Sequence, residues 1–255
     1  MKTFIDKTTT INVEKLEIGR GAKIGKHVVI EGHEVIIGRE AFIDDYAYIG
    51  GGSAFDECAF FHAGDFLHMG RNSHVNTARG VTVGDEVGIG VETKIFTHGA
   101  YLSELQGFPV QFAPVTIGDR VWLPNAWVNP GVTIGDDVVV AARSLVNRDL
   151  PSGCLAGGVP ARVLKKGHYP AGIEVSVMKS MIRGIVRESG MNPLSLIIHS
   201  PMWFVVSGAK FDISKMAITG EASPLSEKVR NQFRRHGIRF RYEVIDGHYQ
   251  PWGDE

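Results

Sequence analysis

The sequence has 255 residues, enough for one long domain or two ordinary ones with a substantial buried core. The 27 basic and 28 acidic residues nearly cancel, and no basic stripe is interleaved with aromatic residues, which argues against nucleic acid as a partner. No apolar run approaches the roughly 18 residues of a membrane-spanning helix, and the charged N-terminal segment does not have the pattern of a signal peptide. Cys58 and Cys154 match no metal or disulfide spacing. We therefore expect a soluble, cytoplasmic protein without a membrane partner.

From residue 10 to residue 150, an aliphatic or aromatic residue returns every six positions, with a two-residue shift after Leu67 and a longer interruption after Ile95. The repeating residues are Ile18, Ile24, Ile30, Ile36, Ile37, Ile43, Ile49, Phe55, Phe61, Leu67, Met69, Val75, Val83, Ile89, Ile95, Ile117, Leu123, Val128 (one position early), Ile134, Val140 and Val146. Six is a multiple of the strand period and not of 3.6, which excludes helices over this range. Short strands that repeat in this way stack into a solenoid with an inward aliphatic ladder.

This repeat resembles that of the hexapeptide-repeat, left-handed parallel β-helix, a mainly β fold in which three hexads form one triangular coil. The resemblance continues through "DLPSGCLAGGVPARVLKK", which is similar to the closing motif of hexapeptide acyltransferases, especially sugar O- and N-acetyltransferases of the galactoside, maltose and polysaccharide type. It implies that residues 1–166 form a β-helix acyltransferase domain. It further implies a coenzyme A-dependent enzyme that transfers an acetyl group from acetyl-CoA to a hydroxyl or amino group of a sugar or nucleotide-sugar.

The interruption of the repeat begins at His98, three residues after Ile95, in a turn at a corner of the expected prism. The insertion that follows can fold over the histidine and enclose a site. An imidazole can take a proton from an attacking hydroxyl or amine near neutral pH and return it to a leaving thiolate. No Ser or Cys stands in a nucleophile-elbow or cysteine-enzyme context, which favours direct attack over an acyl-enzyme. In the acetyltransferases that the sequence resembles, an imidazole in a stretch like "TH…P…PVTIG" is the catalytic base, and His98 matches that position.

Candidates for acceptor contacts lie on both sides of the histidine. Asn76 precedes His98 by about one coil, where related sugar acetyltransferases use an asparagine to contact the acceptor. Tyr101, Glu104 and Phe108 lie in the insertion and are further candidates, although solvated loop positions explain them equally well.

The resemblance also implies a donor site for acetyl-CoA, or another acyl-CoA, at the end of the repeat. Gly158 in the closing motif permits close approach of the pantetheine arm. Three cationic residues of that motif are candidates for the phosphates, Arg162, Lys165 and Lys166, with a solvated basic segment as the alternative. Trp122 matches an aromatic residue near the family's donor groove, although it can also simply pack. Ala142 is a further donor-site candidate, and it stands where the family has alanine. Ala141 and Arg143 stand where the family has glycines, which narrows the pantetheine channel, while Arg143 offers a phosphate contact.

His62, His68 and His74 are six apart and invite a metal site like that of the γ-class carbonic anhydrases, which are also β-helices. Residues six apart fall on successive faces of the prism, so we expect no metal site within one chain. An inter-subunit site, and thus a metal lyase, remains an alternative, and a non-enzymatic trimeric scaffold is another. The resemblance itself implies a homotrimer whose active sites lie between subunits.

The repeat stops at Lys166, and residues 167–255 read as a small α+β accessory domain of unrecognised family and role. Ile173, Val177, Met181 and Ile185 recur four apart and predict a helix that ends near Gly190. Ser223 as the N-cap and Pro224 at the first helical position predict a second helix. Short strands are expected at residues 194–199, 202–207, 211–219 and 238–245.

Overall fold

A computed structural model describes residues 2–253 of the chain. The chain divides into two compact units, Lys2–Ala171 and Gly172–Glu255. The first unit consists mainly of parallel strands, and the second of an antiparallel sheet with two α-helices. Within residues 2–253, none of the helices has both the length and the apolar character that crossing a membrane requires.

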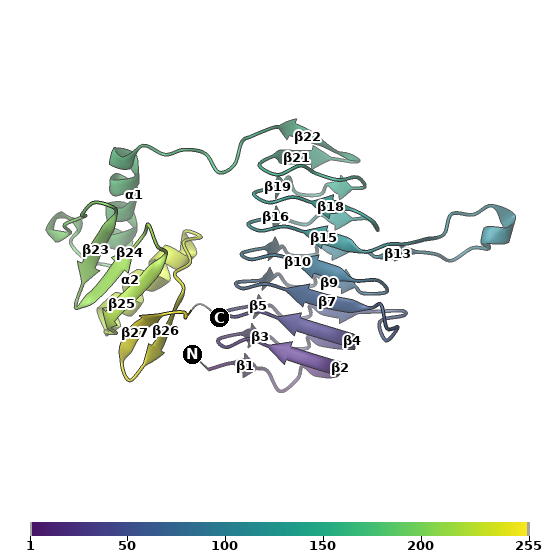
Figure 1. The fold of residues 1–255 in the computed structure, drawn as a ribbon, viewed down its shortest axis with the longest axis horizontal. Helices are drawn as coiled ribbons and strands as arrows, with labels where there is room; N and C mark the ends of the chain where they lie inside the picture. Colours follow the sequence, from purple (N-terminus) through teal and green to yellow (C-terminus); the bar gives the residue numbers. More distant parts are fainter. Residues whose placement is uncertain (1, 254–255) are drawn as a thin grey trace. The chain divides into compact units, whose positions relative to one another are not determined.

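The strands of the first unit stack coil upon coil (Figure 1). One face is a nine-stranded sheet with the order β1 (Phe4–Ile5), β3 (Lys23–Ile24), β5 (Phe42–Ile43), β8 (His68–Met69), β11 (Gly88–Ile89), β16 (Trp122–Leu123), β19 (Val139–Val140), β21 (Leu155–Gly158) and β22 (Ala161–Lys165). The other two faces belong to one eleven-stranded sheet, because β4 (Val29–Ile37) pairs with a strand on each of them. The second face is formed by β7 (Phe60–Ala63), β10 (Val81–Val83), β15 (Val115–Ile117) and β18 (Thr133–Ile134). The third face is formed by β6 (Tyr48–Gly50), β9 (His74–Asn76), β12 (Lys94–Ile95), β17 (Trp127–Val128) and β20 (Leu145–Val146), while β2 (Thr10–Ile18) pairs with β4.

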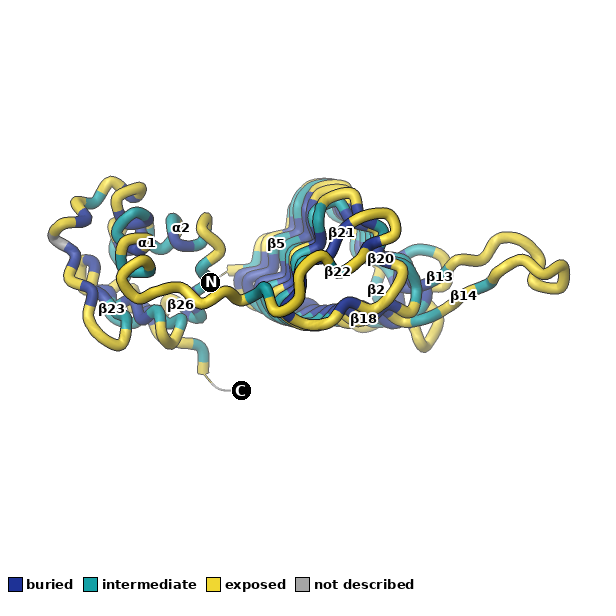
Figure 2. Tube along the Cα trace, turned by 90° about the horizontal axis from the view of Figure 1, so that it is seen from above, coloured by how far each residue is buried: buried dark blue, intermediate teal, exposed yellow. Residues whose placement is uncertain are grey.

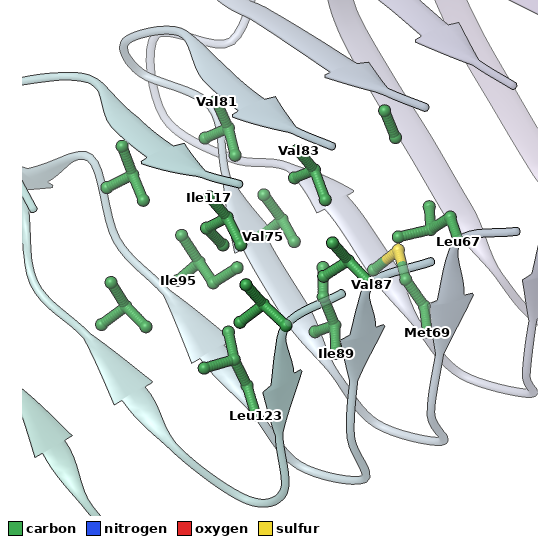
Figure 3. Packing of buried hydrophobic residues seen from close by; sticks show 14 of the residues in the cluster. Leu67, Met69, Val75, Val81, Val83, Val87, Ile89, Ile95, Ile117 and Leu123 are labelled. Carbon is green, nitrogen blue, oxygen red and sulfur yellow. The ribbon is translucent and has the colours of Figure 1, made fainter. Parts of the chain in front are cut away.

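The predicted ladder forms the core of these coils. Ile43, Met69, Ile89 and Leu123 are neighbours on successive strands of the first face, and all are fully buried. Figure 3 shows the last three with other residues of the core. Two expected members of the ladder lie elsewhere. Strand alternation directs the side chains of Val35 and Ile37 into the core, so Ile36 faces outward. Phe55 lies in the loop between β6 and β7 and is exposed.

Two insertions interrupt the coils, one at residues 51–59 and the other after Ile95. The second forms an arm made of β13 (His98–Gly99), the 3-10 helix η1 (Glu104–Gln106) and β14 (Gln111–Phe112). β13 and β14 pair antiparallel at its base, and the arm projects away from the coils (Figures 1 and 2). The expectation that the insertion folds over His98 of its own chain is therefore wrong, because a hairpin at the base leads the intervening residues outward.

The second unit is a five-stranded antiparallel sheet with the order β23 (Trp203–Val206), β24 (Ala209–Asp212), β25 (Ala217–Glu221), β27 (His248–Pro251) and β26 (Tyr242–Ile245). Its core joins the sheet to α1 (Val175–Glu188) and α2 (Pro224–Arg235) through a cluster of phenylalanines, Phe204, Phe211, Phe233 and Phe240. The predicted cap is confirmed, since Ser223 Oγ accepts a hydrogen bond from the Ser226 N–H at 3.1 Å. The two units together confirm the predicted fold class, a left-handed parallel β-helix followed by a small α+β domain.

Details of the second unit depart from expectation. The predicted strand at 194–199 instead begins with the 3-10 helix η2 (Pro193–Ser195). In α1, Val177 and Met181 are half-exposed, and the buried face carries Ile182 and Val186 in addition to Ile185. A four-residue spacing advances about 40° per step around a helix, so the predicted stripe drifts off the buried face. The expected strand at 211–219 is divided between β24 and β25 by a turn, and β27 was not anticipated.

Candidate functional site

His98 stands at the base of the arm, where it begins β13. Its register partner on β14 is Phe112, and the two rings stack with their centres 5.5 Å apart. The Arg79 guanidinium lies 4.8 Å from the centre of the same phenylalanine ring and forms an ion pair of 3.6 Å with Asp56. Asp56 belongs to the insertion at residues 51–59, so the two interruptions of the repeat are linked beside His98.

Asn76 determines which nitrogen of His98 carries the proton. Asn76 is only 3% exposed, and its Oδ1 accepts hydrogen bonds from Thr97 Oγ1 at 2.9 Å and from the backbone N–H groups of Thr97 and Ala78 at 3.4 Å. Its Nδ2 donates to the Gly50 carbonyl at 3.4 Å, which fixes the orientation of the amide. Oδ1 also lies 2.7 Å from His98 Nδ1, and because an amide oxygen only accepts, Nδ1 carries the hydrogen. In the neutral imidazole the lone pair is therefore on Nε2.

A pocket of about 460 Å³ opens beside His98 on the third face of the β-helix. Its lining residues are Tyr48, Gly51, Gly52, His74, Asn76, Phe96 and His98. Tyr48 and His74 are register neighbours on β6 and β9, and each directly precedes a buried ladder residue. Alternation along a strand points such residues outward. The sequence signal for these two pocket residues is therefore their position directly before a ladder residue. The pattern of inward residues alone does not reveal it.

Burial controls the charge of this pocket. It raises the pKa of Tyr48 to about 12, and the hydrogen bond that the Tyr48 hydroxyl donates to Glu31 Oε1 acts in the same direction. Burial also lowers the pKa of His74, and the positive charge of Lys94 acts in the same direction. At neutral pH, Tyr48 therefore keeps its proton and His74 is uncharged.

The predicted acceptor residues are distributed between two places. Asn76 lines the pocket, although its side chain is already engaged with His98 and the backbone. Tyr101, Glu104 and Phe108 lie on the arm, are exposed and do not line the pocket beside their own His98. Their contacts with an acceptor remain predictions.

A second pocket, of about 730 Å³, lies further along the same face. Its lining residues are Asn72, Glu92, Lys94, Asn125, Trp127, Arg143, Ser144, Leu145 and Val159. Trp127 pairs with Lys94 on one side and Leu145 on the other, and its ring lies 5.9 Å from that of Phe96 in the first pocket. The two pockets are thus joined by a contact between aromatic rings.

The predicted donor residues converge only in part. Arg143 lines the second pocket, and the Gly158 N–H donates to the hydroxyl of the pocket residue Ser144 at 3.0 Å. Ala142 is adjacent to Arg143 in the turn between β19 and β20. Three cationic candidates are exposed on or just after β22, namely Arg162, Lys165 and Lys166. Trp122 lies in β16 on the first face, so it is Trp127, not anticipated, that lines the pocket.

His62, His68 and His74 occupy β7, β8 and β9, which lie on the second, first and third faces. The expected divergence of these histidines is confirmed. In the described part of the chain, no group of three or more His, Cys, Asp or Glu side chains could hold a metal ion.

The coils and the histidine at the interruption define a β-helix of the hexapeptide type, and comparisons with known proteins confirm the predicted resemblance to acetyltransferases. The chain is 38% identical over 89 residues to galactoside O-acetyltransferase from Escherichia coli (strain K12), a match that covers 34% of this chain and 44% of that protein. It is 38% identical over 68 residues to chloramphenicol acetyltransferase from Morganella morganii, covering 26% of this chain and 32% of that one. The chain thus spans less than half the length of these relatives. No model of a protein family matches it.

Among solved structures, the chain is similar to a hexapeptide-repeat acetyltransferase from Vibrio cholerae O1 biovar eltor, complexed with acetyl coenzyme A. The identity is 28%, with 59% of this chain and 70% of that chain covered and a TM-score of 0.40. A maltose O-acetyltransferase from Clostridium difficile 630 is 26% identical, with 57% and 69% covered and a TM-score of 0.35.

The tautomer of His98 is directly measurable. In ¹⁵N-labelled protein at a pH where the imidazole is neutral, we expect Nδ1 of His98 to resonate as a protonated nitrogen and Nε2 as an unprotonated one. Asn76→Ala removes the accepting oxygen, so both resonances should move toward the tautomeric average, while those of His68, on another face, should not change. A protonated Nε2 in the unaltered protein would contradict the assignment.

Proposed function

We propose that the protein is a coenzyme A-dependent acyltransferase that moves an acetyl group from acetyl-CoA to a hydroxyl or amino group of a sugar or nucleotide-sugar. The observation that carries the proposal is the hydrogen bond between Asn76 and His98, which leaves Nε2 as a free base beside an open pocket. The resemblance to acetyltransferases gives the reaction class that needs such a base.

In the proposed reaction, the acceptor lies in the pocket beside His98 and its hydroxyl or amine attacks the acyl carbon of the thioester. His98 Nε2 takes the proton of the attacking group as the new bond forms. The imidazolium, with both nitrogens protonated, keeps its hydrogen bond to Asn76. When the tetrahedral intermediate collapses, the C–S bond breaks and Nε2 returns the proton to the thiolate.

The second pocket is the proposed donor site because it adjoins the first and carries two cationic side chains, Lys94 and Arg143. Charged donors of this kind bind phosphate oxygens well. Arg162, Lys165 and Lys166 remain proposed contacts for the phosphates at the end of the β-helix, and Gly158 a proposed contact for the pantetheine arm. Ala142, next to Arg143, also belongs to the proposed donor set, whereas Trp122 lies on the first face and does not line this pocket.

Removing the base tests the reaction. We expect His98→Ala to lower kcat for thiol release from acetyl-CoA, measured against a panel of sugars, by about 10²- to 10⁴-fold, the usual contribution of general acid–base catalysis. His68→Ala is the matched control, because His68 lies on another face of the same coils. An unchanged rate in the His98 variant would refute the assignment, and a scaffold without activity would release no thiol in either protein.

The proposal includes a homotrimer with active sites shared between subunits. The arm supports it, because Tyr101 and Leu105 are 97% and 99% exposed and Leu102 is half-exposed, an apolar set that a neighbouring subunit would cover. Across such an interface, Tyr101, Glu104 and Phe108 of one subunit would face the pocket of the next. A cytoplasmic location is also proposed, since Cys58 and Cys154 are both free.

Sedimentation measures the assembly. At micromolar concentration we expect a mass of about three times 27.9 kDa. Replacing Tyr101 and Leu105 together by Ser should shift the protein toward monomer and lower the activity, because the arm then loses its apolar contacts. The double variant Thr82→Ser and Thr116→Ser, on outward positions of the second face, is the control. A fully active monomer would contradict shared sites.

A further inference from the structure

The pocket beside His98 has an aromatic wall made by three successive coils. Tyr48 of β6, His74 of β9 and Phe96 directly after β12 contribute one ring each. The ring centres of Tyr48 and His74 are 4.7 Å apart at 77°, and those of His74 and Phe96 are 6.2 Å apart at 50°. The in-register stacking of β6 and β9 brings Tyr48 and His74 together. Phe96 follows β12 two residues after Lys94, the register partner of His74, and adds its ring at the point where the regular coil ends.

This wall is uncharged. The residues that line the pocket in the described structure include no Asp, Glu, Lys or Arg. Tyr48 keeps its proton, because its pKa is raised to about 12, and the Glu31 carboxylate is occupied by the Tyr48 hydroxyl. Burial lowers the pKa of His74, and within residues 2–253 no group hydrogen-bonds to its Nε2, so the ring stays neutral.

Such a pocket discriminates between acceptors by their charge. An ammonium group loses hydration on entering it and finds no carboxylate among the lining residues in exchange. The C–H face of a neutral ring packs on aromatic side chains without this cost. Gly52 also lines the pocket, and a Cβ there would meet nothing within 4 Å, which leaves room for a ring that carries hydroxyls.

We propose that Tyr48, His74 and Phe96 form the acceptor subsite and that it binds an uncharged, hydroxyl-bearing ring, so that the enzyme acylates oxygen in preference to nitrogen. This inference rests on the proposed function for its chemistry. The subsite itself is a binding property that can be measured without turnover.

The first experiment offers the full-length protein acetyl-CoA and matched pairs of acceptors, each a neutral hexose or hexoside and its 2-amino counterpart. For the best pair, kcat/KM for the neutral member should exceed that for the amino member by at least tenfold. A preference for the amino sugar would overturn the proposal. A preference that disappears in Glu104→Gln would overturn it as well, because it would show that a carboxylate of the arm binds the ammonium group.

The second experiment locates the subsite. His74→Ala and Phe96→Leu should each raise KM for the neutral acceptor several-fold to tenfold and leave KM for acetyl-CoA within twofold. His68→Ala, which removes a ring that stacks on Phe42 on another face, should change neither. Unchanged acceptor KM in both pocket variants would refute the assignment of the wall.

A binding measurement separates the two proposals. Saturation-transfer NMR should detect neutral hexosides bound to the His98→Ala protein, and Phe96→Leu in that background should raise the Kd from a saturation-transfer titration several-fold to tenfold. Binding without thiol release in the unaltered protein would leave the subsite standing and refute the acyltransferase. Absence of any neutral-sugar binding would overturn the subsite.

Discussion

The in-register stacking of short parallel strands is the constraint on which the rest of the β-helix depends. A two-residue strand such as β11 or β16 buries one aliphatic residue, Ile89 or Leu123, and the pleat then forces the neighbouring side chain outward. Because coils repeat this arrangement, outward residues of successive coils become neighbours in space although they are far apart in sequence. Tyr48 and His74 meet in this way, as do Lys94 and Trp127. Both pockets are products of the core pattern.

The same constraint explains what the sequence could predict. A period of six identifies strands and their inward residues without knowledge of any contact, and the break at His98 marks where the period fails. The period does not show where a coil is lengthened, so it assigns Phe55 to the ladder, whereas Phe55 lies exposed in an insertion. The sequence also does not reveal the hydrogen bond from His98 to Asn76. The resemblance assigns Asn76 to the acceptor, whereas the structure places its Oδ1 against His98 Nδ1.

In the second unit, the sequence alone does not show which segments pair as strands. Within the predicted strand at 194–199, Leu196 and Ile198 are buried while Ile197 and His199 are exposed, as alternation along a strand would give. A strand, however, needs a hydrogen-bonding partner, and within the described residues this segment makes only an isolated bridge between His199 and Trp203. The Asn192 side chain instead accepts from the Leu194 N–H and starts a 3-10 turn. Helix caps are local, which is why Ser223 could be assigned from the sequence.

At the candidate site, a buried amide performs the positioning that a carboxylate performs in many histidine-dependent enzymes. Asn76 orients the imidazole through its amide oxygen, which also accepts hydrogen bonds from Thr97. Because an amide is neutral, this positioning adds no charge. The most direct test is the pH dependence of kcat/KM in Asn76→Asp. The control is Asn129→Asp, because Asn129 also follows a ladder residue, two coils further along the same face. A carboxylate against Nδ1 stabilises the imidazolium, so the acid limb of the profile should move to higher pH by about one unit or more in the first variant only. An acid limb that stays at the same pH in Asn76→Asp would show that His98 is not the base.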